Sequence, residues 1–290
     1  FHLSYLALAF LALGLPRGVL NLVFGVPADI SSYLIPQPPT RLVAFTGSTA
    51  VGKHLTGLAA QHMKPVLMEL GGHAPVIVCA DADPAEAGTV CATRKARNGG
   101  QVCTSPTRFY VHQDIYASFT EAFVRRANAV TIGNGMDAGT EMGPLANLRR
   151  IEAMERLVAD AKAKGARLLA GGARLARPGY FFPVTVLADV PGHADVMREE
   201  PFGPLAVINP VANLDEAIEK ANALPFGLAA YGFTHDARNA DRMAEGLEAG
   251  NVSINTLEAS VAETPFGGVK ESGYGREGGV EGLAPYLTVK

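Results

Sequence analysis

The sequence has little charge and no excess of either sign, and this excludes two classes of partner. Only 18% of its 290 residues are charged, and 25 basic side chains stand against 28 acidic ones, for a net charge of -3. Binding to nucleic acid or to an anionic membrane surface depends on a clustered basic charge, which this balance does not provide. We therefore expect neither a nucleic-acid partner nor a membrane partner.

Cysteine is also scarce. The three cysteines, Cys79, Cys91 and Cys103, are an odd number and form no C-x-x-C pair. Their spacing indicates neither a disulfide framework nor a zinc site, so we expect no metal. Free thiols are typical of a reducing compartment, and we therefore expect a cytoplasmic protein.

Apolar runs long enough to cross a bilayer, about 20 residues, are missing as well. The first thirteen residues, FHLSYLALAFLAL, are strongly apolar but have no basic start and no small-residue cleavage pattern, which argues against a signal peptide. We expect a buried helix there, ended by Gly14 and Pro16. Because Phe1 stands inside this apolar pattern, we also expect that an N-terminal portion is absent.

The sequence does contain short apolar runs that alternate with helical windows. This order is typical of α/β proteins whose parallel strands are joined by right-handed crossovers. The expected strands are 18–25, 41–47, 74–80, 107–112, 205–211, 229–234 and 250–255. The expected helices are 49–60, 84–97, 114–130, 147–164, 213–223 and 236–248. Within 26–40, Pro36, Pro38 and Pro39 disfavour a helix.

Two glycine-rich stretches are candidates for phosphate binding. In LVAFTGSTAVG, an apolar strand passes through Gly47 and Ser48 into a helix, so backbone N–H groups and the positive helix end meet at one turn. That turn suits a dinucleotide pyrophosphate, although strand-glycine-helix turns are common in α/β proteins. The literal G-x-G-x-x-G match, GYGREG from Gly273, follows no strand and opens no clear helix, so we interpret it as a flexible or tightly packed loop.

Two side chains have the character of catalytic groups. Cys103 follows a glycine pair in NGGQVCTS, and a thiol with an ordinary pKa of about 8.5 needs a helper or a favourable field to attack at neutral pH. The Cys103 amide could donate to a developing oxyanion. Glu69 lies among apolar residues in PVLMELGGHAPVIV, where burial would raise its pKa toward that of a general base. A core cysteine and a solvated or ion-paired glutamate are the ordinary alternatives.

Read together, several segments resemble the NAD(P)-dependent aldehyde dehydrogenases in order and spacing. These segments are FTGSTAVG, MELGGHAPVIV, NGGQVCTSPTRFYV, EEPFGPL, NVSIN and TPFGGVKESGYGREGG. The resemblance covers the chain from GLPRGVLN onward, and its wording is most similar to the bacterial succinate-semialdehyde-dehydrogenase-like branch. It implies an α/β fold with a partial Rossmann-type cofactor domain at 1–69 and a complete catalytic domain at 70–250. The segment 251–290 would line the substrate tunnel and begin the oligomerisation strand.

The resemblance also implies roles for individual residues. Cys103 would add to an aldehyde, and Glu69 would activate the water that hydrolyses the resulting thioester. Contacts to NAD or NADP would come from Gly47, Ser48, Gly52, Gly71, Glu200 and Phe202, with Glu200 on the nicotinamide ribose. Contacts to the substrate would come from Val102, Thr104, Ser260 and Phe266, with Ser260 near a distal carboxylate. The partners would be a small aldehyde and, in the full-length protein, further copies in a homo-dimer or tetramer.

The chain departs from that family at both ends. The family's N-terminal half, with a second oxyanion donor and a lysine segment for the adenosine ribose, has no match, and the joining strand begins at YLTVK and stops at Lys290. The resemblance therefore predicts a shortened cofactor domain. Two other readings stay open: a non-catalytic piece that folds but binds no dinucleotide, and a cofactor-free thiol esterase that uses Cys103 and Glu69.

Overall fold

The larger of two lobes is built on a seven-stranded sheet. The computed structural model describes residues 2–290. The strand order is β10-β9-β3-β4-β7-β6-β5, and every neighbouring pair is parallel except β5 with β6. The strands are β3 (Pro75–Val78), β4 (Arg108–His112), β5 (Arg167–Ala170), β6 (Thr185–Ala188), β7 (Leu205–Val211), β9 (Ala229–Phe233) and β10 (Asn251–Ile254). The prediction of a mainly parallel α/β sheet is confirmed.

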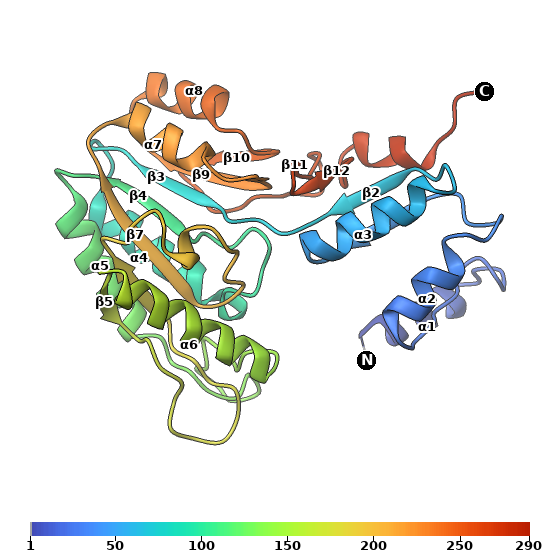
Figure 1. Ribbon diagram of the computed structural model, residues 1–290, viewed down its shortest axis with the longest axis horizontal. Helices are drawn as coiled ribbons and strands as arrows, with labels where there is room; N and C mark the ends of the chain where they lie inside the picture. Colours follow the sequence, from blue (N-terminus) through green and yellow to red (C-terminus); the bar gives the residue numbers. More distant parts are fainter. Residues whose placement is uncertain (1) are drawn as a thin grey trace.

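Helices cover both faces of this sheet, as parallel sheets require (Figure 1). The helices are α4 (Pro84–Ala96), α5 (Tyr116–Asn128), α6 (Leu148–Ala163), α7 (Leu214–Asn222) and α8 (Ala237–Gly246). Along β4, Phe109 and Val111 belong to one core with Phe119 and Phe123 of α5, while Tyr110 belongs to the other core. This alternation follows from the period of two along a strand, and it explains the continuous apolar runs in the sequence.

The helix ends agree with the predicted windows to within two residues. Side-chain caps account for several starts: Asp83 accepts from the amides of Ala85 and Glu86, and Asn147 accepts from that of Arg150. Such caps satisfy N–H groups that have no partner inside the helix. Strands β5 and β6 were missed by the sequence reading, because each has only four residues between glycine- and proline-rich turns.

The smaller lobe consists of a three-stranded sheet in the order β1-β2-β12, covered by α3. Its elements are β1 (Val43–Thr46), β2 (Val66–Glu69), β12 (Gly273–Tyr274) and α3 (Thr49–Ala60). The GYGREG stretch begins in β12, where a Cβ atom at Gly273 would lie 1.8 Å from the Met68 carbonyl oxygen. Of the two alternatives, a flexible or a tightly packed loop, the structure shows tight packing at Gly273. Outside both sheets, β8 (Phe226–Gly227) pairs with β11 (Val269–Lys270).

Three predictions for the first forty residues are wrong. The first helix, α1 (His2–Ala12), is not buried: Leu8 and Leu11 are exposed. Residues 18–25 form no strand, because the structure offers this run no neighbouring strand to pair with. A helix, α2 (Pro27–Leu34), does form between 26 and 40. Its proline stands at the first position, where a missing N–H costs nothing, and the other prolines follow its end.

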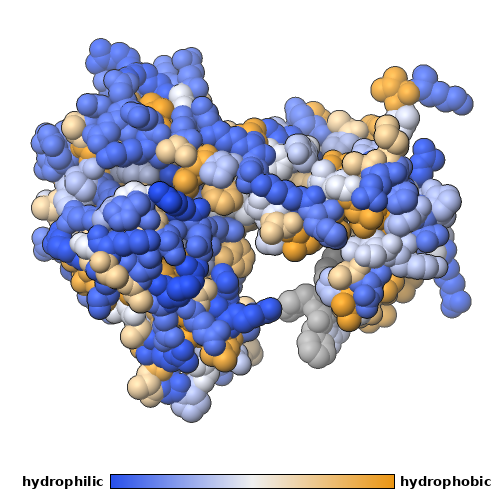
Figure 2. Space-filling model, viewed as in Figure 1, coloured by the Kyte–Doolittle hydropathy of each residue, from blue (hydrophilic) through white to orange (hydrophobic). Residues whose placement is uncertain are grey.

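Three short 3-10 helices complete the element list: η1 (Arg97–Gly100), η2 (Asp195–Met197) and η3 (Glu281–Tyr286). The first two matter for the site, since they lead into Cys103 and Glu200. Figure 2 shows a mostly hydrophilic face on the larger lobe and an open gap between it and the smaller lobe. The strand β2 continues across this gap into β3 through residues 70–74 (Figure 1).

Candidate active site

The candidate site lies on the crossing from β2 to β3. Glu69 is the last residue of β2, and residues 70–74 run on without regular structure. The crossing is fixed on one side by Ser272, whose carbonyl accepts the Leu70 N–H at 3.0 Å and whose hydroxyl donates to the Gly71 carbonyl at 2.7 Å. On the other side, the Gly72 N–H donates to Glu200 Oε1 at 3.1 Å. These bonds hold both lobes against one short peptide.

Gly71 and Gly72 are needed because two groups approach them closely. A Cβ atom at Gly71 would lie 2.6 Å from Glu200 Oε2, and one at Gly72 would lie 2.7 Å from the Cys103 carbonyl oxygen. Side chains at these positions would displace Glu200 and the Cys103 backbone. The structure therefore brings Gly71, Cys103 and Glu200 together around the crossing that begins at Glu69, as the resemblance predicts for four of the candidate residues.

A left-handed turn places Cys103. After α4 ends, Asn98, Gly99 and Gly100 have φ values of 50°, 59° and 67°, a region that favours glycine. A Cβ atom at Gly100 would lie 2.1 Å from the Gly203 carbonyl oxygen, so the turn packs on the chain that follows Glu200. Beyond the thiol, Thr104 is buried, and its carbonyl accepts from the Tyr231 hydroxyl at 2.7 Å.

A buried lysine supports the same loop from below. Lys95 of α4 is 1% exposed, and its Nζ donates to Ser105 Oγ at 3.0 Å and to Thr107 Oγ1 at 3.3 Å. Burial lowers the pKa of Lys95 to about 7, against the opposing influence of Glu200. Sequence reasoning did not single out Lys95, because a lysine in an amphipathic helix is ordinarily solvent-exposed.

Glu69 has the electrostatics of a general base. It is 4% exposed, and neither of its carboxylate oxygens has a hydrogen-bond partner. Burial raises the pKa of Glu69 to about 8, nearby Glu277 raises it further, and Arg276 opposes the shift. A carboxyl group of this kind exchanges its proton near neutral pH, which is what a general base requires. The expected rise in its pKa is confirmed.

The Cys103 thiol is less easily ionised than an ordinary one. Its pKa is raised chiefly by burial and then by the charges of Glu200 and Glu69, while the backbone N–H groups of Cys103 and Thr104 favour the thiolate. The protein at rest therefore holds this thiol protonated at neutral pH. Of the three cysteines, Cys103 is the one that is partly exposed, whereas Cys79 and Cys91 are buried. Cys103 is thus not fully enclosed in the core, as the other two cysteines are.

Glu200 is a second buried carboxyl group with a displaced pKa. Burial raises the pKa of Glu200 to about 7, and the Gly72 N–H, Lys95 and Arg150 oppose the rise. Phe202 follows two residues later, is 37% exposed and has a φ of +43°, which is strained for an aromatic residue. Glu200 and Phe202 thus stand at a sharp bend of the chain beside the crossing.

The turn from β1 into α3 adjoins the same crossing. The Gly47 N–H donates to the Glu69 carbonyl at 3.0 Å, and a Cβ atom at Gly52 would overlap the Leu70 side chain at 2.3 Å. Ser48 gives α3 no side-chain cap, which leaves the first amides of a twelve-residue helix without that partner. Thr49 Oγ1 is buried without a partner and lies 3.2 Å from the Cβ position of Gly71. An orphaned hydroxyl, uncapped amides and a glycine cradle fit a phosphate-bearing cofactor.

Only some of the candidate substrate-binding residues lie near Cys103 and Glu69. Phe266 pairs through its backbone with Glu277, and a Cβ atom at the next residue, Gly267, would lie 3.0 Å from Glu69 Oε1. Phe266 is thereby close to the base. Ser260 is exposed in a groove of about 340 Å³ that also includes Ser253 and Pro265 but is not lined by Cys103. Val102 is half-buried beside the thiol.

Arg97 is a further residue that sequence reasoning missed. It stands six residues before Cys103, is exposed, and forms no side-chain hydrogen bond or ion pair within the described part of the chain. It lines a groove of about 630 Å³ together with Arg94, Asn255 and Thr256, and the last two belong to the segment 251–290 that is predicted to line the substrate tunnel. In the sequence, the sign of its role was a basic residue without an acidic neighbour, directly before the turn that leads to Cys103.

Two classes of site are missing from residues 2–290. No three His, Cys, Asp or Glu side chains with described positions group closely enough to hold a metal ion. Over the same residues, no helix combines the length and the apolar character that a membrane crossing needs.

Comparison with known proteins agrees with this geometry. Residues 2–290 match the sequence model of the aldehyde dehydrogenase family. The chain is 50% identical over 276 residues to a putative 4-(hydroxymethyl)benzenesulfonate dehydrogenase of Comamonas testosteroni, covering 95% of this chain and 57% of that protein. It is 42% identical to the NADP-dependent succinate-semialdehyde dehydrogenase of Escherichia coli K12, covering 99% of this chain and 60% of the relative.

A solved structure shows the same fold. The crystal structure of betaine aldehyde dehydrogenase from Staphylococcus aureus in complex with NAD⁺ superposes with a TM-score of 0.95 at 35% identity, over 99% of this chain and 57% of that one. The chain thus spans about 60% of the length of the relatives it matches. With a family match over nearly its whole length, a shared fold and the grouping of Glu69, Cys103 and Glu200, the chain belongs to the aldehyde dehydrogenase family.

Proposed function

We propose that the protein to which this chain belongs oxidises an aldehyde to a carboxylic acid with NAD⁺ or NADP⁺. The observation that carries the proposal is the meeting of a partly exposed thiol, Cys103, and an unpaired buried carboxyl group, Glu69, at one glycine crossing. A thiol alone would leave the substrate bound as a thioester. A base with a pKa near neutrality supplies the second half of the reaction, which is hydrolysis.

The residues act in sequence. Cys103 gives its proton to water and its sulfur bonds to the aldehyde carbon, while the N–H groups of Cys103 and Thr104 face the negative charge that develops on the oxygen. The resulting thiohemiacetal loses a hydride and becomes a thioester. Glu69 then takes a proton from water, whose oxygen bonds to the carbonyl carbon as the carbon–sulfur bond breaks. The carboxylic acid leaves, and Cys103 is free again.

A dinucleotide would supply the redox chemistry by accepting that hydride when bound. Gly47, Ser48 and Gly52 would lie against its phosphates at the start of α3, with Gly71, Glu200 and Phe202 at the nicotinamide end. The uncapped α3 and the orphaned Thr49 hydroxyl support this placement. Whether the cofactor is NAD or NADP is a matter for binding measurements, since the relatives include both an NADP-dependent enzyme and an NAD⁺ complex.

The substrate is an aldehyde that carries an anionic group at its far end. The two relatives described above are named for substrates with a sulfonate and a carboxylate, respectively. Arg97, with no side-chain partner among residues 2–290, supplies positive charge in a groove that it shares with the predicted tunnel segment 251–290. Ser260 would donate a hydrogen bond from the loop, and Val102, Thr104 and Phe266 would line the path to the thiol.

We also propose that the full protein is a cytoplasmic homo-oligomer, a dimer or a tetramer. The sheet of the larger lobe ends at β10, whose outer edge has no partner strand in the described chain. An unpaired edge of this kind is a natural place for a strand of another copy. Light scattering at several protein concentrations tests the assembly.

The central test is formation of NADH or NADPH from succinate semialdehyde and from a sulfonated benzaldehyde, followed by absorbance. We expect Cys103→Ser to abolish it, and Glu69→Gln to permit one turnover that leaves a thioester on Cys103, detectable by mass spectrometry. Cys79→Ala, away from the site, is the matched control. Ester hydrolysis that depends on Cys103 but not on a dinucleotide would replace the proposal with a thiol esterase. A folded protein with neither activity would mark the chain as a non-catalytic piece.

A further inference from the structure

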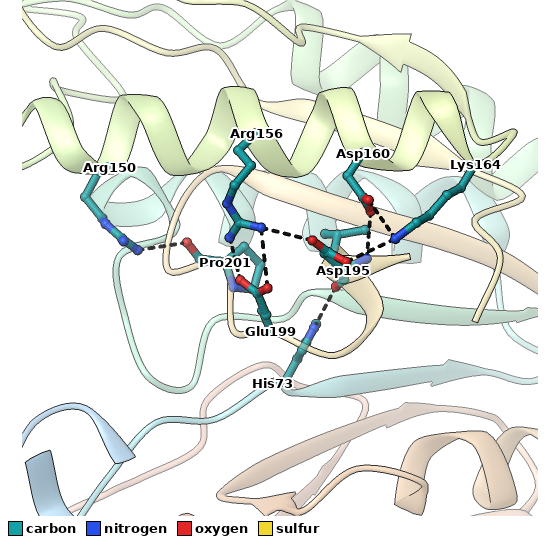
Figure 3. A network of polar contacts seen from close by, with 9 residues as sticks. His73, Arg150, Arg156, Asp160, Lys164, Asp195, Glu199 and Pro201 are labelled. Carbon is teal, nitrogen blue, oxygen red and sulfur yellow. Dashed lines mark hydrogen bonds and ion pairs between the residues drawn. The ribbon is translucent and has the colours of Figure 1, made fainter. Parts of the chain in front are cut away.

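The segment from Asp195 to Pro201, which carries Glu200, is attached to helix α6 along its length. Figure 3 shows basic side chains of α6 pointing down onto this segment. Arg156 Nη1 lies 3.1 Å from Asp195 Oδ2, and Arg156 Nη2 lies 2.5 Å from Glu199 Oε2. Six residues earlier on the helix, Arg150 Nη1 donates to the carbonyl of Pro201, the residue after Glu200, at 3.3 Å. Glu200 is therefore flanked on both sides by residues bound to one helix.

The start of the segment is held more tightly still. Lys164 pairs with Asp195 at 3.0 Å and with Asp160 at 2.6 Å, and Asp160 accepts the Asp195 N–H at 2.8 Å. The Arg156 guanidinium shares Asp195 with this group. Arg156 is thus the side chain that joins the two anchored points, Asp195 and Glu199, to the middle of the helix (Figure 3).

The opposite side of the segment faces the glycine crossing. His73 Nε2 lies 2.9 Å from the Val196 carbonyl, and burial lowers the pKa of His73 well below its usual range, so the ring is neutral and its Nε2 donates. Among residues 2–290, the Glu200 side chain has a single hydrogen bond, from the Gly72 N–H. One bond leaves a carboxylate free to rotate about it, and the position of Glu200 consequently depends on how its backbone is held.

The ion pairs of Arg156 are half-exposed and contribute little to global stability. The side chains of Arg156 and Glu199 are each 50% exposed, and exposed pairs contribute about 0–1 kcal/mol. A matched pair joins the same helix to another loop: Arg174, in the loop after β5, donates through Nε and Nη2 to both carboxylate oxygens of Glu155 on α6, with exposures of 48% and 36%. That pair does not touch the segment from Asp195 to Pro201.

We propose that Arg156 of α6 is a positioning residue for the cofactor. By binding Glu199 and Asp195, it sets the position of Glu200. The inference rests on the proposed function, in which Glu200 bonds the nicotinamide ribose. Arg156 is half-exposed and does not touch Glu200 itself. It acts on Glu200 only through the backbone that joins Asp195, Glu199 and Glu200.

The test compares Arg156→Gln with Arg174→Gln in the complete chain. We expect the dissociation constant for NADH or NADPH, measured by fluorescence titration, to rise about fivefold in R156Q and to change by less than about twofold in R174Q. Both variants should melt within about 3 °C of the parent. Glu199→Gln should reproduce most of the loss, and the R156Q/E199Q double variant should be no weaker than the worse single one. Arg156→Lys, which keeps the charge but not the fork, should fall between.

Amide hydrogen exchange without any dinucleotide gives an independent reading. The amides of 195–203 should exchange several times faster in R156Q and at the parent's rate in R174Q. Equal exchange in the two variants, or equal loss of dinucleotide affinity, would overturn the role of Arg156. If the parent binds no dinucleotide but R156Q still loosens the segment, the proposed function fails while the attachment by Arg156 stands.

Discussion

The two lobes contribute to the candidate site in different ways. The larger lobe encloses its seven-stranded sheet in two cores, with Phe109, Phe119 and Phe123 fully buried on one face. The smaller lobe has a short core around Leu55 and Met68, and the segment before it leaves Tyr5, Leu13 and Phe24 largely exposed. Cys103 and Glu200 belong to the well-packed region, whereas Glu69 and the β1–α3 turn belong to the small one. The nucleophile is thus firmly held, and the base and cofactor turn rest on few contacts.

Replacing one phenylalanine in each region should produce the largest contrast. Phe109→Ala removes a ring that packs edge-on against Phe123 at 5.1 Å between centroids, and we expect the unfolding free energy to fall by about 3–5 kcal/mol. Phe24→Ala should change it by less than about 0.5 kcal/mol, because that ring is 72% exposed. Urea denaturation followed by circular dichroism measures both. Similar losses in the two variants would mean that the N-terminal segment is packed in solution.

Glu69, the proposed general base in the smaller lobe, should make the unfolding free energy depend on pH. The unfolded chain releases the Glu69 proton near pH 4.5, but the folded protein keeps it to about pH 8. The native state therefore binds more protons in this window, and the unfolding free energy should fall as the pH rises through it, by up to about 5 kcal/mol.

Glu69→Gln removes that titration. The difference in melting temperature between E69Q and the parent should thus grow in favour of the variant from pH 5 to pH 8. A difference that stays constant over this range would show that Glu69 has an ordinary pKa and is exposed to water. The smaller lobe would then be more open than its buried carboxyl group indicates.

A smaller effect is expected at the thiol of the larger lobe. Iodoacetamide should label Cys103 alone in the folded protein, at a rate that still rises with pH above 8.5, because burial and the carboxylates raise the pKa of the thiol. Glu200→Gln should increase the rate about twofold to fivefold at pH 8, since Glu200 has the larger of the two carboxylate effects on the pKa of Cys103. Glu155→Gln, whose partner Arg174 does not touch the segment from Asp195 to Pro201, is the matched control. Equal rates in both variants would contradict the influence of Glu200 on Cys103.

Much of the larger lobe follows from the sequence because its signals are local. The helical windows 147–164 and 236–248 predicted α6 and α8, and in the structure both helices begin at side-chain caps, Asn147 and Asp236. In the first forty residues the same reasoning failed. The run at 18–25 is as apolar as a strand, but a strand also needs a neighbour, which no local pattern reveals.

The candidate site shows the same division between residues with local sequence signals and residues whose contacts are long-range. Cys103, Glu69 and Glu200 were found through motifs that each lie within a few residues, joined by resemblance to a family. Arg156, His73 and Lys95 escaped notice because their roles depend on contacts between distant parts of the chain: His73 meets the carbonyl of Val196, and Arg156 meets Glu199. Nothing beside these residues in the sequence distinguishes them from other charged or polar positions.

The left-handed turn before Cys103 has a consequence for protein engineering. Because Gly100 packs directly on the Gly203 carbonyl, the nucleophile loop and the bend after Glu200 cannot be redesigned one at a time. A library that varies residues 98–100 alone would sample almost only inactive variants, whatever substrate it is screened on. Transplanting this thiol into another scaffold would require moving both segments together, as a single cassette.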